Sequence, residues 1–317
     1  MLPIFLRRGA TFGIALLALA ALPAMAQTRL VETSLGTFEV PENPTRILTT
    51  HHANTQTLLD LGYVPIGRAA VDQRYTTSEQ WEAIVDVPVI TLDGGELNYE
   101  LIASLEPDLI LEADLATTPE RLERLKQIAP VAVFPLRGQN FRFARSPQFA
   151  EVLNAVDRYE ALEADYAARL EQIAENYGDI AAAHPVGILG VWSFDTPTIW
   201  TSDSGAGQII APAGAVFGAT GEALPHEDGR EVTISQEDIL ATLSDVDIIF
   251  YNSFADGSFV NEELERIFEL DVFQRLPAAQ EGHVYPLGLL TVGSYAIAHN
   301  TLDHYVAALE AIASEEQ

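Results

Sequence analysis

The chain has 317 residues, 48% of them hydrophobic, no cysteine, and 46 acidic against 17 basic residues, which gives a formal net charge of −29. This length and apolar content are enough to bury a large core, and they exclude a disordered chain. The missing cysteines exclude disulfides, thiolate metal sites, a thiol nucleophile and a lipid-modified cysteine, and the negative charge argues against nucleic acid as a partner.

The first 26 residues have the pattern of a secretory signal peptide. Arg7 and Arg8 precede an apolar run over residues 12–22, and a small-x-small sequence ends at Ala26. The run is shorter than the roughly 18 residues that a membrane span needs. We therefore predict export and cleavage after Ala26. An uncleaved anchor is the alternative, and the paired arginines leave open whether export follows the general secretory or the twin-arginine route.

Short apolar runs then alternate along the chain with segments of helical periodicity. The runs have the length of strands buried on both faces, and they cover residues 46–49, 109–111, 131–134, 186–191 and 246–250. The helical segments cover residues 55–61, 99–105, 118–128, 235–243 and 261–268. This alternation predicts an α/β fold with parallel sheets wrapped by helices.

A weak internal repeat indicates two lobes. Residues 100–111 resemble residues 238–250, with one residue inserted before the second strand, and each segment is a helix that leads into a strand. The two copies lie too far apart for a solenoid repeat. We interpret them as one equivalent unit in each of two lobes, with chance similarity between two generic helix and strand units as the alternative.

The segment between these two units is predicted to be helical. Residues 149–183 contain no proline, and apolar residues recur there at helical spacing among Glu, Asp and Arg. We predict one or two long helices, the second from about Tyr159 to Ile180 and roughly 30 Å long, which is enough to bridge two lobes rigidly. The predicted organisation is a signal peptide at 1–26, an N-terminal lobe at 27–148, a helical linker at 149–183 and a C-terminal lobe at 184–317.

Ligands bind beyond the carboxyl ends of the strands in open parallel sheets, so candidate site residues follow from the predicted strands. These positions carry aromatic rings, guanidinium groups and a pair of histidines. They are His51, His52, Arg68, Arg74, Tyr75, Arg137, Arg142, Trp192 and Tyr251. Arginine gives carboxylate or catecholate oxygens strong, oriented hydrogen bonds. The pattern predicts a mouth for a ligand with negative charge and flat apolar surface; pairing of these arginines with surface carboxylates is the alternative.

His51 and His52 are the only adjacent histidines. Neighbours on an extended segment point to opposite faces, so we expect them to line a cleft or cap a helix, with metal ligation as the alternative. The chain contains no nucleophile elbow, zinc-protease helix or complete phosphate loop. We therefore predict no enzyme; a secreted hydrolase that uses one of these histidines as a base is the remaining enzymatic alternative.

Several segments in chain order carry family motifs. They are Leu61-Gly-Tyr-Val-Pro-Ile-Gly after the strand of Pro44-Thr-Arg-Ile-Leu, Tyr99-Glu-Leu-Ile-Ala-Ser-Leu-Glu-Pro-Asp-Leu-Ile-Leu, Ile128-Ala-Pro-Val, Ile234-Ser-Gln-Glu-Asp-Ile-Leu with Asp247-Ile-Ile-Phe, and Phe273-Gln-Arg-Leu-Pro-Ala-Ala-Gln-Glu-Gly-His-Val-Tyr. In this order they resemble the periplasmic substrate-binding proteins of iron-siderophore and vitamin B12 (Fe/B12) importers, which serve ABC transporters. Phe273 stands where tryptophan is usual in that family.

The resemblance implies a class III periplasmic binding protein: an α/β fold of two Rossmann-like lobes with central parallel-type sheets, joined by a long α-helix. It implies a monomer in the periplasm that binds an iron(III)-siderophore complex without a resident cofactor or metal site and delivers it to an inner-membrane permease. Haem or cobalamin is the alternative ligand. In the haem case His51, His52 or Tyr75 is the candidate axial ligand.

The resemblance also bears on individual residues. Arg74 falls where ferric-siderophore binders often place an arginine after the Pro-x-Gly turn, and Arg230 falls in the loop before Ile234, where a second often sits. Leu287-Gly-Leu-Leu-Thr lacks the aromatic cluster of some hydroxamate-binding relatives. That departure favours a carboxylate or catecholate ligand over a hydroxamate.

Overall fold

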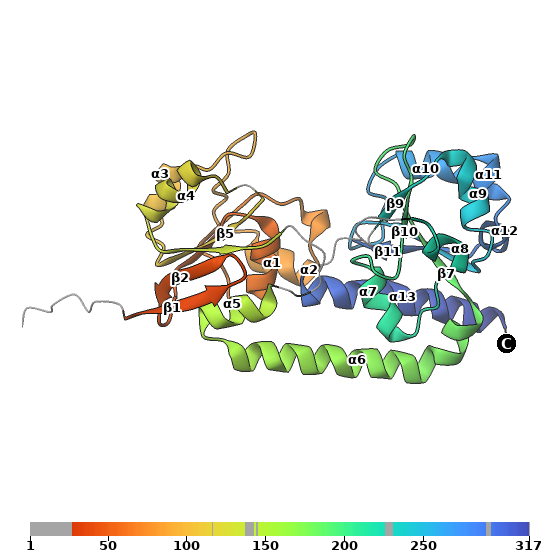
Figure 1. Cartoon of the computed structure of the whole chain (residues 1–317), viewed down its shortest axis with the longest axis horizontal. Helices are drawn as coiled ribbons and strands as arrows, with labels where there is room; N and C mark the ends of the chain where they lie inside the picture. Colours follow the sequence, from red (N-terminus) through yellow and green to blue (C-terminus); the bar gives the residue numbers. More distant parts are fainter. Residues whose placement is uncertain are drawn as a thin grey trace, which may run out of the picture.

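A computed structural model describes residues 27–115, 117–136, 143, 145–225, 231–289 and 293–316. Two α/β lobes lie next to each other along the long axis of the molecule, and one long helix runs along both (Figure 1). None of the helices in the described part of the chain combines the length and the apolar character that crossing a membrane requires. The predicted signal peptide and its cleavage site after Ala26 lie outside the described residues.

The N-terminal lobe is built on a four-stranded parallel sheet with the order β4-β3-β5-β6. Its strands are β3 (Ile47–Thr49), β4 (Gly67–Arg68), β5 (Leu109–Ala113) and β6 (Val131–Phe134). An antiparallel hairpin of β1 (Thr28–Thr33) and β2 (Gly36–Pro41) packs against β6 and α5. The helices of this lobe are α1 (His52–Asp60), η1 (Gln73–Tyr75), α2 (Ser78–Ile84), α3 (Tyr99–Ser104), α4 (Pro119–Lys126) and α5 (Ser146–Leu153).

The C-terminal lobe has a five-stranded sheet with the order β11-β10-β7-β8-β9. Its strands are β7 (Val186–Gly190), β8 (Thr198–Trp200), β9 (Glu231–Thr233), β10 (Ile248–Asn252) and β11 (Val284–Gly288). The strands β11, β10 and β7 run parallel as predicted, whereas β8 pairs antiparallel with both β7 and β9. The direction of β8 follows from its short link to β7, because a parallel crossover takes about a dozen residues or more.

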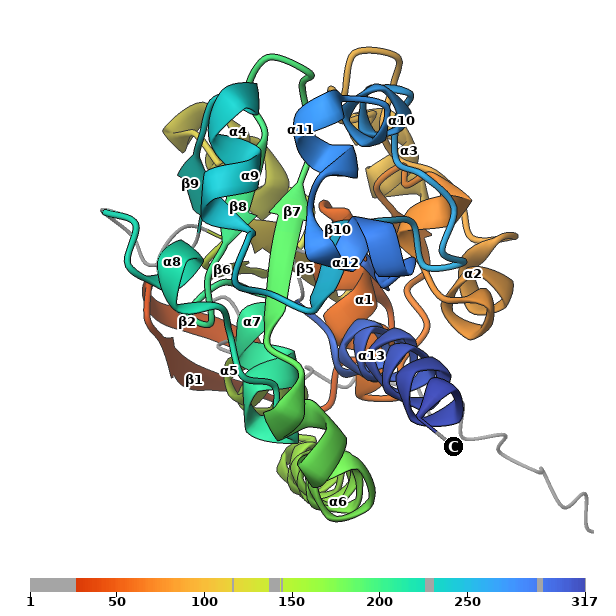
Figure 2. The same cartoon turned by 90° about the vertical axis from the view of Figure 1, so that its right-hand side faces the viewer.

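Helices cover both faces of the C-terminal sheet, and the last of them is the longest of this lobe. They are α7 (Gly207–Ile210), η2 (Ala211–Ala213), α8 (Ala219–Glu222), η3 (Gln236–Asp238), α9 (Ile239–Thr242), α10 (Glu263–Phe268), α11 (Asp271–Gln274), α12 (Pro277–Glu281) and α13 (Tyr295–Glu315). α13 runs beside α6 (Val156–Ala183) on the same side of the molecule (Figures 1 and 2).

The strands β3, β5, β6, β7 and β10 are buried on both faces, which explains why they read as continuous apolar runs. In β3, Ile47 packs with residues of α1 and α5, and its neighbour Leu48 packs with residues of α3 and α4 on the opposite face. In β10, Ile248 faces α6 and α13 while Ile249 faces α9 to α12. Successive side chains of a strand point to opposite faces of the sheet, so each lobe has one apolar cluster on each face of its sheet.

The link between the lobes is the 28-residue helix α6. At 1.5 Å per residue it is about 42 Å long, longer than the segment predicted from the sequence. It does not continue from α5 because Asn154 adopts a left-handed conformation (φ 55°, ψ 43°) that ends α5. Tyr166, Ile173 and Ala181 on α6 are buried against the C-terminal lobe. One helix therefore connects the lobes and also belongs to the core of one of them.

We predict that Ile173→Ala destabilises the protein by about 2–5 kcal/mol, because it leaves a cavity where α6 packs on the C-terminal lobe. Ile173 is 1% exposed. Glu171→Ala, an exposed position on the same helix, is the control and should change the free energy of unfolding by no more than about 0.5 kcal/mol. Urea denaturation measures both. Equal effects of the two substitutions would show that α6 is not packed as described.

Candidate functional site

Residues just beyond the carboxyl ends of β4 and β10 touch across the two lobes. The backbone N–H of Ala255 donates to the carbonyl of Arg74 at 3.3 Å. The ring of Phe254 receives the Arg74 guanidinium at 4.3 Å and the edge of Tyr75 at 5.2 Å. The strand ends of both sheets therefore meet at one place, which is where open parallel sheets bind ligands. We call the positions that follow the carboxyl ends of the parallel strands in the two sheets the interlobe mouth.

Arg74 lies at this mouth but has an acid beside it. Its side chain is 55% exposed, and its Nε and Nη2 donate to the Asp72 carboxylate at 3.0 and 2.8 Å. The hydrogen bonds from Arg74 lower the pKa of Asp72 to about 2. Arg74 thus forms a salt bridge with Asp72 in the same turn. Pairing of an arginine with a surface carboxylate is the alternative that the sequence left open.

Two of the predicted contact residues lie inside the lobes instead. Arg68 is 3% exposed and donates to the carbonyls of Ile84 and Ala69. Tyr251 is 8% exposed and packs against the rings of Phe259 and Phe268. Both side chains support the fold of their own lobe, and this placement corrects the prediction that they face a ligand.

Two further predicted residues lie at strand ends. Trp192 is 45% exposed beyond the end of β7, and Tyr75 lies at the lobe contact already described. Three others lie outside the described residues: Arg137, Arg142 and Arg230.

The end of β7 is held by Asn252, the last residue of β10. Its side chain accepts from Val191 N at 2.8 Å and donates to Val191 O at 3.3 Å.

His51 and His52 stand at the start of α1, beyond the end of β3. His51 is the N-cap, and its Nδ1 accepts the backbone N–H of Ala53 at 3.2 Å. Burial, then the neighbouring charge of His52 and those of two arginines, lower the pKa of His51 to about 3, and burial also lowers the pKa of His52. Both rings are neutral at pH 7. Because Nδ1 of His51 acts as acceptor, the proton of the neutral ring sits on Nε2, which makes Nε2 a hydrogen-bond donor.

Sequence reasoning missed Arg145, which precedes α5. Its side chain is 3% exposed; Nη2 donates to the carbonyl of Gly293 at 3.0 Å, whereas Nε and Nη1 have no hydrogen-bond partner among the residues that the structure describes. Burial lowers its pKa to about 10, so it stays charged at neutral pH. It follows Arg137 and Arg142 in the segment after β6, and no local pattern distinguishes the arginine that becomes buried.

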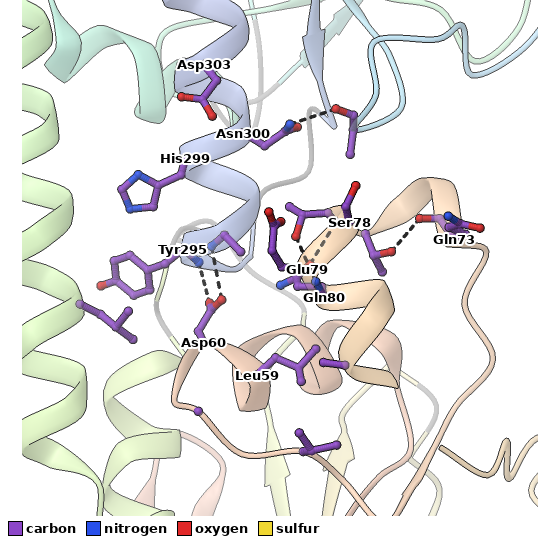
Figure 3. Close-up of a pocket in the computed structure, with 18 of the residues that line it drawn as sticks. Leu59, Asp60, Gln73, Ser78, Glu79, Gln80, Tyr295, His299, Asn300 and Asp303 are labelled. Carbon is purple, nitrogen blue, oxygen red and sulfur yellow. Dashed lines mark hydrogen bonds between the residues drawn. The ribbon is translucent and has the colours of Figure 1, made fainter. Parts of the chain in front are cut away.

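A groove of about 1020 Å³ opens on the flank of the lobe junction, between α1, α2, α6 and α13 (Figure 3). Its lining is rich in carboxylates, and of the sequence-predicted residues it includes Arg74. The acidic lining residues are Asp60, Glu79, Asp165, Asp256 and Asp303. This groove is distinct from the strand-end positions of His51, His52 and Trp192, which do not line it.

At the floor of this groove the N-terminal lobe caps α13. The Asp60 carboxylate accepts the N–H groups of Tyr295 and Ala296 at 2.6 and 3.3 Å (Figure 3). Gln80 donates to the Ser294 hydroxyl at 3.3 Å. Burial raises the pKa of Asp60 to about 8, against the lowering effects of its hydrogen bond from Ala296 and of the charge of Arg145.

Across the described part of the chain, no group of three or more His, Asp or Glu side chains is arranged to hold a metal ion. The strand ends instead offer the neutral imidazole rings of His51 and His52 and the exposed ring of Trp192. These groups bind organic and anionic surfaces by stacking and hydrogen bonding.

Residues 47–288 match the sequence model of the periplasmic binding protein family, and the chain belongs to this family. Among curated relatives, the probable siderophore-binding lipoprotein YfiY of Bacillus subtilis is 25% identical over 88% of this chain and 86% of the relative. The ferric enterobactin-binding periplasmic protein FepB of Escherichia coli is 24% identical over 88% and 90%.

Solved structures agree with the fold. The siderophore periplasmic binding protein from the fuscachelin gene cluster of Thermobifida fusca has a TM-score of 0.71 and 26% identity, and the match covers 85% of this chain and 98% of that one. Staphylococcus aureus SirA, solved with staphyloferrin B, has a TM-score of 0.70 and 17% identity over 89% and 99%.

These comparisons confirm the predicted class III fold and the family resemblance. Proteins of this family are the binding components of transport systems, which take a small-molecule ligand and present it to an ABC permease. Their location outside the cytoplasm, as lipoproteins or periplasmic proteins, applies to this chain as well.

We predict that the free energy of unfolding changes less with pH in Asp60→Asn than in the wild type. A carboxyl whose folded pKa is raised stabilises the protein below its unfolded pKa, and this contribution is lost as pH rises through the folded pKa. Relative to the variant, the wild type should therefore lose stability between about pH 4 and pH 8, by at most about 1.4 kcal/mol per pH unit.

The measurement is urea unfolding of both proteins at pH 4, 6 and 8. Asp165→Asn is the control, because Asp165 lines the same groove with its side chain 78% exposed. A constant difference between the wild type and Asp60→Asn over this range contradicts the burial of Asp60 as described.

Proposed function

We propose that the protein binds an iron(III)-siderophore complex at the interlobe mouth and delivers it to an ABC permease in the inner membrane. The observation that carries this proposal is the meeting of the strand ends of two α/β lobes, where Tyr75 packs on Phe254 and Trp192 is exposed. Flat aromatic faces suit the rings and apolar surface of such a chelate. Several relatives are named for binding ferric siderophores, which supports this ligand class.

In this proposal, the iron is coordinated by oxygen atoms of the chelator and not by the protein. Carboxylate and catecholate oxygens suit a hard cation, and the protein then has only to recognise the outer surface of the complex. The protein therefore needs no resident cofactor, and the proposed role involves no bond chemistry. We further propose a soluble periplasmic monomer released by cleavage after Ala26, since a chain without cysteine lacks the attachment point of a lipoprotein.

Haem binding through His51 is the alternative that the structure disfavours. Ligation of iron by Nε2 of His51 requires a lone pair there and hence a proton on Nδ1. Nδ1 already accepts the N–H of Ala53 at the start of α1. Haem ligation would break this cap, which costs about 1 kcal/mol, whereas a siderophore oxygen can accept from the proton on Nε2 without disturbing it.

We predict that ferric catecholate or ferric carboxylate siderophores quench the tryptophan fluorescence of the protein at micromolar concentration or below. Trp192 is exposed and follows the end of β7, so Trp192→Phe should remove most of the quenching. Trp200, which is 5% exposed in the C-terminal core, supplies the control variant Trp200→Phe, whose quenching should persist.

The titration panel contains a ferric tricatecholate, ferric citrate, a ferric trihydroxamate, haem and cobalamin. Binding of one or more ferric chelates, with the catecholate or carboxylate preferred, agrees with the proposal. Binding of haem or cobalamin together with no response to every ferric chelate would overturn it.

A further inference from the structure

Phe254 belongs to the C-terminal lobe, but two residues of the N-terminal lobe lie against its ring. It stands just after β10 and is 2% exposed. The Arg74 guanidinium lies over the ring at 4.3 Å, and Tyr75 meets it edge-on at 5.2 Å. Tyr75 also packs against the apolar cluster that the C-terminal sheet forms with α6 and α13. We call the contact of Arg74 and Tyr75 with Phe254 and Ala255 the interlobe latch.

Each half of the interlobe latch is fixed to its own lobe by hydrogen bonds. In the N-terminal lobe, Gln56 of α1 donates to the carbonyl of Tyr75 at 2.7 Å. In the C-terminal lobe, Asn300 of α13 donates to the carbonyl of Ala255 at 2.9 Å, and Nε2 of His304 lies 3.2 Å from the same oxygen. A relative movement of the lobes therefore carries one half of the latch away from the other.

The contact between the two halves depends mainly on burial of the Phe254 ring. Its one backbone hydrogen bond, from the N–H of Ala255 to the carbonyl of Arg74, is 3.3 Å long, which exceeds the usual range. Arg74 is 55% exposed and is shared with Asp72, and cation–π contacts at exposed sites are weak. Parting the halves exposes the ring to water, which is unfavourable. The latch therefore favours closed lobes through an apolar contact that can part without breaking either lobe.

The interlobe latch lies away from the elements that join the lobes. α6 links them covalently, and Asp60 of the N-terminal lobe caps the start of α13. Figure 3 shows Gln73 of η1 on one side of the start of α13 and α6 on the other. A rotation of the lobes about α6 and the start of α13 therefore separates the latch and leaves the Asp60 cap in place.

We propose that the interlobe latch controls the opening of the interlobe mouth. When it is closed, it holds the strand ends of the two sheets together, and when it parts, the lobes rotate away from each other about α6 and the start of α13. Tyr75 and Phe254 follow β4 and β10, whose carboxyl ends border the mouth, so parting the latch widens the mouth itself. This inference does not depend on which ligand the mouth takes.

Spin labels on the two lobes test the opening in the protein without ligand. The chain has no cysteine, so Glu120→Cys on α4 and Glu265→Cys on α10 label one exposed position in each lobe. Both helices lie on the side of the molecule opposite α6, where opening increases the distance between the labels (Figures 1 and 2). Double electron–electron resonance measures the distribution of this distance. We expect one narrow distribution with the latch intact and an additional, longer population in Tyr75→Ala and in Phe254→Ala.

Two control variants separate the latch from general effects of substitution. Tyr75→Phe keeps the ring and should retain the narrow distribution. Phe268→Ala removes a ring that packs on other aromatic rings inside the C-terminal lobe, and it should also leave the distribution unchanged. Tyr75→Ala decides the question where Phe254→Ala fails to fold.

A longer population in the latch variants alone supports the proposal. An unchanged distribution in Tyr75→Ala, an equal change in Phe268→Ala, or a broad distribution with the latch intact overturns it. Each of these results is obtained without ligand, so the proposed function stands or falls separately with the titration of ferric chelates.

Discussion

The capping of α13 by the N-terminal lobe is the contact on which the shape of the site depends. The Asp60 side chain at the end of α1 accepts hydrogen bonds from the first two amides of a 21-residue helix, and it thereby satisfies two of the N–H groups that a helix start leaves without an intrahelical partner. Thr57 and Arg145 bind the carbonyl of Gly293 just before that helix. Together with α6, which links the lobes covalently, these contacts set the distance between the strand ends.

The local charges near the lobe junction differ from what the net charge of the chain suggests. A chain with a net charge of −29 repels anions at long range. At the mouth, Arg74 is offset by Asp72, and both histidines are neutral because of burial. Arg145 stays charged inside the protein, at the lobe junction. Interactions with a buried charge are screened less by water and salt than those with surface charges, so its positive charge acts on the nearby His51 and His52 in spite of the overall negative charge.

Several features of the fold were predictable because they depend on local pattern. The apolar runs at β3, β5, β6, β7 and β10 are strands buried on both faces, and the long helix predicted from about Tyr159 to Ile180 appears as α6 (Val156–Ala183). The antiparallel β8 was missed because three residues carry no periodicity. α13 was missed as well, although Ser294 caps it and its buried residues recur at helical spacing. In that case the signal was present in the sequence.

The sequence by itself determined the two-lobed α/β class, the long helix and the types of side chain at the strand ends, since these follow from residue type and spacing along one segment. Only the tertiary structure decided which of these side chains face outward: Arg68 and Tyr251 lie in the lobe interiors, and Arg145 lies at the lobe junction. The physical reason is that burial and charge at one point depend on segments far apart in the chain, such as α1, α5 and the start of α13, whose convergence no local pattern records.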